Sequence, residues 1–429
     1  MKKIIAGVLA VMMMTAAFAG CSNSGTASSS SAQGSAAAAD ESSLFGDEDN
    51  IKLKVWGPDK SVDLLKKQCD AFIAKYPDKT ISIDVVAQGE NDAATQLLND
   101  ASTAADVFGL PSDQLNKLVN AKVIQKVATS FLDDVKANNE ENVVKAGTVD
   151  DTLYAFPETA DNGYYLVYDK SVIKEGDEAK LETVLEDCKA AGRKFIMSAG
   201  DGFYACMFVF TGGCQTAGLE EDGLTQKFSD YDETEVISTM QAFSKLFHDY
   251  SGTFQSLEVS NISSGFASGT CGAGIDGTWD SASNQAALGD NYGAAKLPTI
   301  NVNGEDKQIV SMFGYKYIGV NAASQFPRAS QILANYLTSE ECQVQRAEEL
   351  GWGPSNKAAA SSDVVTKSAT IKAVLEQAKH SVAQADLADQ FWDPMGNLGN
   401  KLIAENTDPT NADYMKTLLE DTLANIKDV

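Results

Sequence analysis

The pattern of apolar and polar positions opens with one uninterrupted apolar stretch. Residues 4–18 carry no charge, follow lysines at positions 2 and 3, and precede the small residues Ala19 and Gly20. A basic start, a short apolar run and small residues behind it are typical of a secretory leader. The run is shorter than the about 20 apolar residues that span a bilayer. We therefore predict an export signal over residues 1–20, with an uncleaved anchor helix as the alternative.

A strand, a helix and a second strand are predicted next. Apolar residues alternate over 51–55 and again over 81–85, while between them they recur at helical spacing from Val62 to Tyr76, before Pro77. Alternation indicates half-buried strands and the wider spacing an amphipathic helix, which proline ends. Strand–helix–strand is the signature of a parallel sheet with a right-handed crossover.

The same two periods continue to the end of the chain. Helical spacing occurs at 181–191, 236–250, 329–348, 371–385 and 414–426. Short strands are expected at 166–168, 195–197, 273–275, 292–297 and 317–320. The pattern predicts an α/β protein, and the about 380 residues after position 50 suffice for two domains.

A polar segment separates the leader from this body. Residues 22–39 are Ser, Ala, Gly, Asn, Thr and Gln, with no aromatic or branched aliphatic side chain. Such a segment cannot bury enough apolar surface to fold. Five acids follow between positions 40 and 49. We expect a flexible linker over residues 21–50.

Charge and motifs exclude several functions. The net charge is −26, from 60 acidic and 34 basic residues, which disfavours nucleic acid as a partner. The chain lacks GxGxxG after a strand, GxxxxGK[ST], HExxH and GxSxG. Its only histidines are His248 and His380, so a Ser-His-Asp site has little to draw on. We expect no cofactor.

Six cysteines remain besides Cys21, at positions 69, 188, 206, 214, 271 and 342. Their spacings show no CxxC, and neither histidine lies near a cysteine pair, which disfavours a metal site. Cys206 and Cys214 could form a bridge. Buried free thiols are the favoured interpretation, because Cys69 falls on the apolar face of a predicted helix.

Ala19-Gly20-Cys21 resembles the bacterial lipobox, although Phe18 stands where leucine is usual. The resemblance implies that Cys21 is lipidated and becomes the N-terminus of the mature chain. Because a diacylated cysteine supplies two chains, it can hold a protein at a membrane. We expect a lipoprotein on the extracellular face of the cell membrane.

Several segments of the body resemble the extracellular solute-binding proteins of ABC importers (solute-binding family 1), above all the maltose and maltodextrin-binding proteins. The matching segments, in chain order, are Leu53-Lys54-Val55-Trp56-Gly57-Pro58-Asp59-Lys60, Ala105-Asp106-Val107-Phe108, 154–163 (YAFPETADNG), Ile275-Asp276-Gly277-Thr278-Trp279, Asn291-Tyr292-Gly293 with Leu297-Pro298-Thr299, 319–324 (GVNAAS) and Phe391-Trp392. Each motif is weak alone, but their common order across the chain makes the resemblance strong.

The resemblance implies a two-lobed, periplasmic-binding-protein-like fold with a ligand cleft between hinged lobes. We expect the N-terminal lobe over 51–157 plus 312–353, and the C-terminal lobe over 158–311 plus 354–429. The implied partners are an oligosaccharide, foremost a maltodextrin or other α-glucan, and the membrane permease of an ABC transporter. The resemblance implies a monomer that binds its ligand and is not an enzyme.

A sugar presents apolar C–H faces, which aromatic plates cover, and a rim of hydroxyls, which charged and amide groups bind. Trp279 follows a turn-like Asp-Gly-Thr after an apolar strand, and Trp392 stands at a break before a helix, so both favour stacking on ligand over burial in the core. Phe203 and Tyr204 fall near the family's stacking tyrosine, and which of them faces the ligand stays open. Trp56 and Trp352 are placed nearer the hinge or core.

The polar contacts are expected from five residues. Asp59 and Lys60 follow the first strand at its carboxyl end, where ligands lie in open α/β sheets; a solvated turn is the alternative. The resemblance further implies that Asp113 is a second sugar-binding acid, and that Asp161 or Asn162 is the acid of the first interdomain crossing.

Four positions depart from the maltose-binding pattern. Leu110 and Ser281 replace tryptophans, while Gln114 and Gly396 replace arginines. With fewer aromatic rings for stacking and fewer positively charged side chains, the site is expected to bind a different oligosaccharide or to use a different subset of contacts.

Three alternatives to sugar binding remain. Tryptophans and carboxylates also enclose ammonium groups, as a polyamine receptor requires. A surface glycoside hydrolase needs two carboxylates about 5–9 Å apart across a cleft. An adhesion module has no need of a deep cleft.

Overall fold

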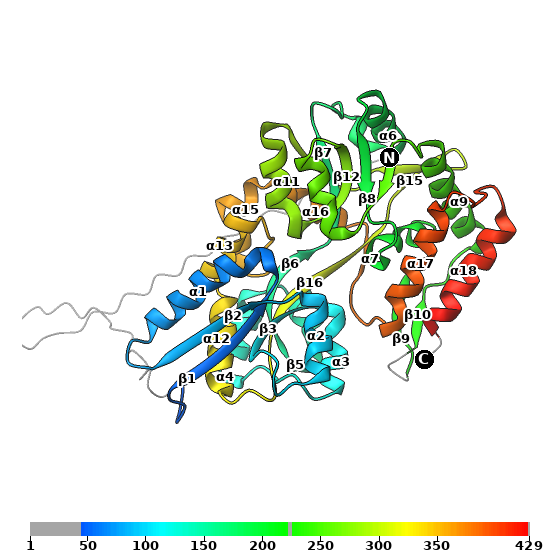
Figure 1. The fold of residues 1–429 in the computed structure, drawn as a ribbon. Coiled ribbons are helices and arrows are strands. Elements are labelled where there is room, and N and C mark those ends of the chain that lie inside the picture. Colours follow the sequence, from blue (N-terminus) through cyan, green and yellow to red (C-terminus); the bar gives the residue numbers. More distant parts are fainter. Residues whose placement is uncertain (1–43, 222–224, 428–429) are drawn as a thin grey trace, which may run out of the picture. The chain divides into compact units, whose positions relative to one another are not determined.

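The structure is a computed structural model that describes residues 44–221 and 225–427. The predicted leader, Cys21 and the linker up to residue 43 lie outside the described residues. Residues 45–50, which were expected to belong to the flexible linker, instead pack on the body, since Phe45 is fully buried and the Glu48 carboxylate accepts hydrogen bonds from Arg328 N and Ala329 N. The chain divides into two compact units at Leu44 and Phe45, and everything below concerns the second, Phe45–Val429 (Figure 1).

The first sheet has six strands in the order β17-β16-β3-β1-β2, with β6 also paired to β16. Their bounds are β1 Ile51–Gly57, β2 Ile81–Ala87, β3 Val107–Pro111, β6 Ala155–Asn162, β16 Ser311–Val320 and β17 Ser381–Ala383. β1 runs parallel to both β2 and β3, and β16 runs antiparallel to β3. The predicted parallel strand–helix–strand unit is confirmed.

The connecting helix α1 (Val62–Lys75) forms as its apolar spacing predicts. Leu65, Cys69 and Phe72 line its buried face against the sheet. The helix ends before Pro77, whose ring cannot continue it. Burial of this face fixes how the chain enters and leaves β1, and so places the turn that follows β1.

The second sheet has five strands in the order β11-β8-β12-β7-β13. Their bounds are β7 Tyr164–Asp169, β8 Lys194–Met197, β11 Phe254–Ser256, β12 Cys271–Gly277 and β13 Tyr292–Ala295. β12 is parallel to β8 and antiparallel to β7. Side chains from this sheet and from helices α6 (Leu181–Ala190), α9 (Glu233–Asp249), α16 (Ala369–Ala378) and α18 (Ala412–Lys427) form the largest apolar cluster.

The remaining helices are α2 Glu90–Asn99, α3 Leu115–Asn120, α4 Thr129–Asn138, α5 Glu141–Ala146, α7 Gly202–Ala205, α8 Met207–Phe210, α10 Ile262–Ala267, α11 Ser281–Leu288, α12 Pro327–Leu337, α13 Glu340–Leu350, α14 Lys357–Ala360, α15 Asp363–Lys367 and α17 Trp392–Ile403. Three hairpins complete the fold: β4 Thr148–Val149 with β5 Thr152–Leu153, β9 Thr216–Leu219 with β10 Gln226–Phe228, and β14 Thr299–Val302 with β15 Glu305–Gln308. Among the helices of residues 44–221 and 225–427, none is both long and apolar enough to cross a membrane.

Two predicted helices differ from the structure. The helix expected over 329–348 is two helices, α12 and α13, because Ser339 caps the second by accepting a hydrogen bond from Cys342 N. The helix expected over 371–385 ends at Ala378. Residues 381–383 form β17 instead, which extends the first sheet parallel to β16.

Two strands connect the sheets (Figure 1). β6 pairs with β16 of the first sheet and leads through Gly163 directly into β7 of the second. A side chain at position 163 would be crowded, since a β-carbon would lie 3.0 Å from a ring carbon of Phe313. The predicted lobe boundaries at 157/158 and 311/312 fall inside β6 and β16. The exact bounds of the lobes stay a prediction, whereas the two-sheet α/β architecture is observed.

All six cysteines in the described part of the chain are buried free thiols. Cys69 lies on the buried face of α1, as predicted.

Candidate functional site

The four aromatic residues singled out in the sequence lie together. Phe203 and Tyr204 belong to α7, Trp279 stands in the 3-10 turn η6 (Thr278–Asp280) behind β12, and Trp392 begins α17. The Phe203 ring centroid lies 6.1 Å from that of Trp279 and 6.2 Å from that of Trp392. The fold therefore gathers aromatic rings from three separate stretches of chain around Phe203.

The structure distinguishes the two neighbours on α7. Tyr204 is 1% exposed and stacks on buried Tyr164, with ring centroids 4.7 Å apart and planes at 17°. Phe203, Trp279 and Trp392 keep part of their surface exposed. Asp201 orients this turn by accepting a hydrogen bond from Phe203 N at 2.8 Å. Of the two, Phe203 is the ring that a ligand could reach, and Tyr204 belongs to the core.

Gly277 sets the position of Trp279. A β-carbon at residue 277 would overlap carbons of the Trp279 indole, so the ring lies directly over the backbone of the last residue of β12. Only glycine leaves that space, because every other residue carries a β-carbon. The Asp-Gly-Thr turn noted in the sequence therefore places this indole.

Asp59 and Lys60 lie in the 3-10 turn η2 (Asp59–Ser61), at the carboxyl end of β1. Asp59 is exposed, whereas the Lys60 ammonium is paired with the carboxylate of Asp280, next to Trp279. Burial lowers the pKa of Lys60, while the carboxylates of Asp276 and Asp59 act in the opposite direction. This ion pair connects the polar turn that follows β1 with the turn that carries Trp279.

Asp113 is buried and already bonded to amides. Its carboxylate accepts a hydrogen bond from Gln384 Nε2 at 3.0 Å and another from the Gln114 amide. Burial raises the pKa of Asp113 to about 6, although the bond from Gln114 lowers it. The side-chain oxygen of Gln384 in turn accepts a hydrogen bond from Asn162 Nδ2. Gln384 thus joins two predicted ligand residues. It was missed because residues 371–385 had a helical pattern.

The Asp161 side chain points toward the backbone of the segment that follows α13 in the chain. It is 2% exposed, and its carboxylate accepts a hydrogen bond from Gly353 N. Burial raises the pKa of Asp161, and the bond from Gly353 opposes that shift. In this structure Asp161 and Asn162 both satisfy neighbouring polar groups of the protein.

Lys316, on β16, is a second residue that the sequence did not single out. Its ammonium lies 2.6 Å from a Glu90 carboxylate oxygen, 5.7 Å from the Trp279 ring centroid and 5.1 Å from that of Trp352. Burial lowers the pKa of Lys316, but Glu90 and other carboxylates outweigh it and raise the pKa. In the sequence, the sign that could have identified Lys316 is that it is a single lysine within an otherwise largely apolar strand. Trp352 is 4% exposed, in keeping with its expected place near the hinge or core.

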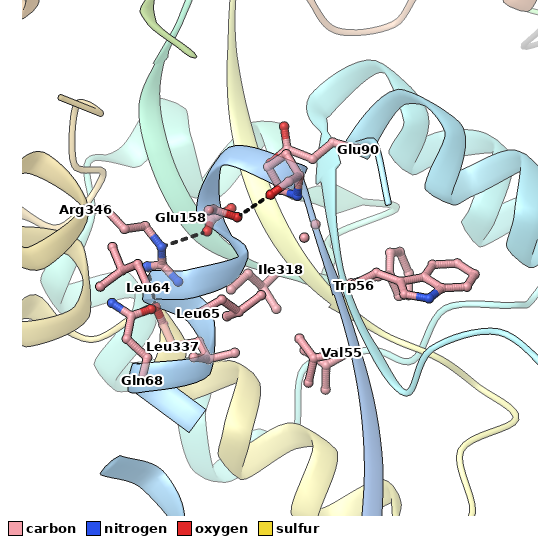
Figure 2. A pocket seen from close by; sticks show the side chains of 16 residues that line it. Val55, Trp56, Leu64, Leu65, Gln68, Glu90, Glu158, Ile318, Leu337 and Arg346 are labelled. Atoms are coloured by element: carbon pink, nitrogen blue, oxygen red, sulfur yellow. Dashed lines mark hydrogen bonds and ion pairs between the residues drawn. The ribbon is translucent and has the colours of Figure 1, made fainter. Parts of the chain in front are cut away.

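A separate small cavity lies between β1 and α1 (Figure 2). Glu90, Glu158, Arg346 and Trp56 are among the residues that line it. Its volume of about 20 Å³ is enough for a single water. Because it is so small and includes none of the clustered aromatic rings, this cavity is distinct from the predicted ligand site.

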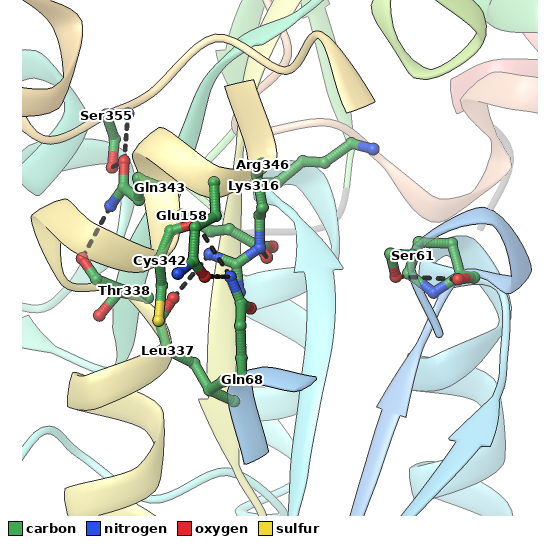
Figure 3. A network of polar contacts seen from close by, with 12 residues as sticks. Ser61, Gln68, Glu158, Lys316, Leu337, Thr338, Cys342, Gln343, Arg346 and Ser355 are labelled. Carbon is green, nitrogen blue, oxygen red and sulfur yellow. Dashed lines mark hydrogen bonds and ion pairs between the residues drawn. The ribbon is translucent and has the colours of Figure 1, made fainter. Parts of the chain in front are cut away.

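In the wall of this cavity, Arg346 Nε lies 3.2 Å from a Glu158 oxygen, with Lys316 beside them (Figure 3). Burial raises the pKa of Glu158 to about 7, and Arg346 opposes that shift. Both charges are almost fully buried, so the pair is part of the interior. In residues 44–221 and 225–427 no group of three or more His, Cys, Asp or Glu side chains could hold a metal ion.

Comparison with known proteins places this geometry in context. Residues 67–373 match the profile of a family described as bacterial extracellular solute-binding protein. No curated protein is significantly similar to the chain in sequence.

Among solved structures, one described as being with acarbose is 27% identical, has a TM-score of 0.77, and covers 88% of this chain and 98% of its own. A maltodextrin binding protein from L. casei BL23 without ligand is 24% identical, with a TM-score of 0.73 and coverages of 88% and 99%. A maltotriose binding protein from Thermus thermophilus, bound with maltotriose, is 19% identical, with a TM-score of 0.73 and coverages of 87% and 99%. These matches show the two-lobed binding-protein fold that the sequence predicts.

Proposed function

The chain belongs to the bacterial extracellular solute-binding proteins, and from this premise we propose that it binds an oligosaccharide and delivers it to the permease of an ABC transporter. A maltodextrin or related α-glucan is the ligand class that the site supports best. Binding involves no chemical conversion, because the solute is handed on unchanged.

The observation that carries the proposal is the cluster of three partly exposed rings, Phe203, Trp279 and Trp392. Pyranose rings present C–H faces that stack on indole and phenyl surfaces, and each ring supplies apolar area with little conformational entropy to lose. The rings come from three chain segments and lie beside polar turns. In a short glucan, the rings could therefore contact the apolar sugar faces, while the turns contact the hydroxyl groups at their rims.

The polar side of the site supports a ligand with hydroxyl groups. Asp59 is exposed and Lys60 is 46% exposed, so both can exchange hydrogen bonds with a ligand. The named similar structures point the same way, since they are described as being with acarbose, or as binding maltodextrin or maltotriose.

A polyamine is the second candidate, because the carboxylates Asp276 and Asp280 flank Trp279 in the chain. Asp276 is fully buried, and Asp280 is 2% exposed. A site rich in acids and indoles attracts ammonium groups through charge and cation–π contacts. The pairing of Asp280 with Lys60 weakens this candidate, because that carboxylate is already neutralised.

We further propose that Cys21 is lipidated and holds the protein at the outer face of the cell membrane through the polar segment that follows it. Support comes from the lipobox-like Ala19-Gly20-Cys21 and from the extracellular nature of the matched family. Mass spectrometry of the chain purified from its own membranes tests this. We expect a diacylglyceryl mass on the peptide beginning at Cys21, and an unmodified, uncleaved N-terminus would contradict it.

Isothermal titration of the full chain tests the ligand class. Maltotriose, xylotriose, a fructo-oligosaccharide and spermidine are titrated in turn, and maltotriose is expected to bind most tightly. Trp279→Ala should weaken maltotriose binding about 10- to 100-fold, since a stacked ring is lost. Trp56→Phe is the matched control, because Trp56 lies on β1 outside the ring cluster. Tight binding of spermidine with no heat from any sugar would overturn the proposal.

A further inference from the structure

Four consecutive residues that follow β12 contact β6, β16, η2 and α13, in that order. Thr278 Oγ1 donates a hydrogen bond to Asp161 O at 3.0 Å, and the Trp279 ring lies 5.7 Å from Lys316 Nζ. The next two contacts are the ion pair between Asp280 and Lys60, and a 3.1 Å hydrogen bond from Ser281 Oγ to the carbonyl of Leu350. The turn that presents Trp279 is therefore also fastened, residue by residue, across the boundary between the two sheets.

The Lys60–Asp280 pair is the charged contact in this set. Asp280 is 2% exposed, and an ionised carboxylate buried to that degree requires a counter-charge. Lys60 supplies it from the turn behind β1, while about half of its own side chain stays exposed. The other carboxylates near Lys60 are Asp276, from β12, and Asp59, its neighbour in η2. Lys60 is thus drawn toward β12 and the turn behind it.

We propose that Asp280 is a positioning residue of this site: it holds the Lys60 ammonium across the boundary between the sheets and so links the Trp279 platform to lobe closure. Its role in affinity rests on the proposed function, but its role in fastening the turn does not. The pair also has no net charge, so Lys60 offers hydrogen bonds to a neutral ligand without attracting an anionic one.

A double-mutant cycle tests the link to binding. Lys60→Met, Asp280→Asn and the double variant are titrated with maltotriose, using the full chain. We expect each single change to weaken binding about tenfold, and the double variant to be about as weak as either single one, because residues of one pair are coupled. A hundredfold loss in the double variant, or an unchanged affinity in Asp280→Asn, would overturn the proposal.

Hydrogen exchange without sugar tests the fastening by itself. In both single variants, peptides covering residues 275–285 and 348–356 should exchange several times faster than in the wild type, because the contacts across the boundary loosen. Peptides over β8 should not change, which shows that the variants are folded. Lys180→Met and Asp306→Asn break an ion pair that lies wholly beside the second sheet, and they serve as matched controls.

The two measurements separate the two proposals. If maltotriose fails to bind the wild type, the proposed function is wrong, yet the exchange experiment still decides the role of Asp280. If maltotriose binds but exchange near residues 278–281 and 350–353 stays at the wild-type rate in both variants, Asp280 has no positioning role.

Discussion

At the scale of single residues, exposure separates ligand platforms from core rings. Phe203 and Tyr204 are adjacent in the chain, but Tyr204 is stacked on Tyr164 and almost fully buried, while Phe203 faces Trp279 and Trp392. The sequence could not separate them, because both side chains are large, aromatic and part of a very short helix. A difference of one residue along α7 decides which ring can meet a ligand.

Substitution at these two positions tests that assignment. Phe203→Ala should weaken maltotriose binding about tenfold, because the central ring of the platform is lost. Tyr204→Phe keeps its ring in the core and should change affinity less than twofold. Calorimetric titration gives both values. A greater loss of affinity in Tyr204→Phe than in Phe203→Ala would show that the rings had been assigned the wrong way round.

Buried acids around the site predict a pH dependence of stability. Burial raises the pKa of Asp276 from 3.8 to about 7, against opposing hydrogen bonds from Asn284 and Gly277. The folded protein therefore holds a proton there that the unfolded chain releases. This contribution is fully present below about pH 4 and is lost as the pH rises to about 7, at up to 1.4 kcal/mol per pH unit for one proton.

Asp276→Asn should accordingly make the free energy of unfolding less dependent on pH between 4.5 and 7.5 than in the wild type. Denaturant unfolding at several pH values measures this slope. Asp306→Asn is the control, because hydrogen bonds from Lys180 and Asn301 lower the pKa of that exposed acid below the tested range. An Asp276→Asn slope equal to that of the wild type would refute the assignment.

At the scale of elements, the end of β12 controls the site. The indole of Trp279 lies over Gly277, and the following turn contacts four partners across the sheet boundary. The position of one strand end thus fixes a platform, an ion pair and two hydrogen bonds.

Gly277→Ala should displace the indole, reduce maltotriose affinity at least as much as Trp279→Ala, and destabilise the fold by about 1–3 kcal/mol through overpacking. Gly252→Ala is the matched control, because a β-carbon there meets no atom within 4 Å. Titration and denaturant unfolding give both quantities. Wild-type affinity in Gly277→Ala would mean that the ring does not depend on this glycine.

Strongly periodic elements were predictable from the sequence. The observed β1–α1–β2 unit agrees with the prediction, because burial of one face of each element gives a clear repeat of apolar residues along the sequence. The segment 379–385 was not predictable, since an apolar spacing that fits a helix also permits β17. There, pairing with the edge of β16 is a long-range interaction that local spacing does not encode.

The candidate site was only partly predictable, for the same reason. Its aromatic members stand at turns that the sequence marks with glycine or proline. Gln384 and Lys316 have no such mark, and they reach Asp113 and Trp279 only through the fold. In both pairs the two residues lie far apart in sequence, so tertiary contact alone defines their roles.

At the scale of the whole molecule, the α/β body has two sheets connected through β6 and β16, and the predicted ligand contacts come from both. Asp59, Lys60 and Asp113 follow strands of the first sheet, while Trp279 follows a strand of the second. A ligand that touches both sets stabilises the arrangement in which they face each other. Under the proposed function, this is the arrangement that the permease would recognise.

The proposed function depends most on the three-ring platform, and a crystal structure of the protein with maltotriose tests that platform directly. We predict pyranose faces in van der Waals contact, about 3.5–4 Å, with the rings of Trp279, Trp392 and Phe203, and hydroxyls within reach of Asp59 or Lys60. A saccharide bound elsewhere, with both indoles free of any sugar contact, would contradict the assignment of these rings as the ligand platform.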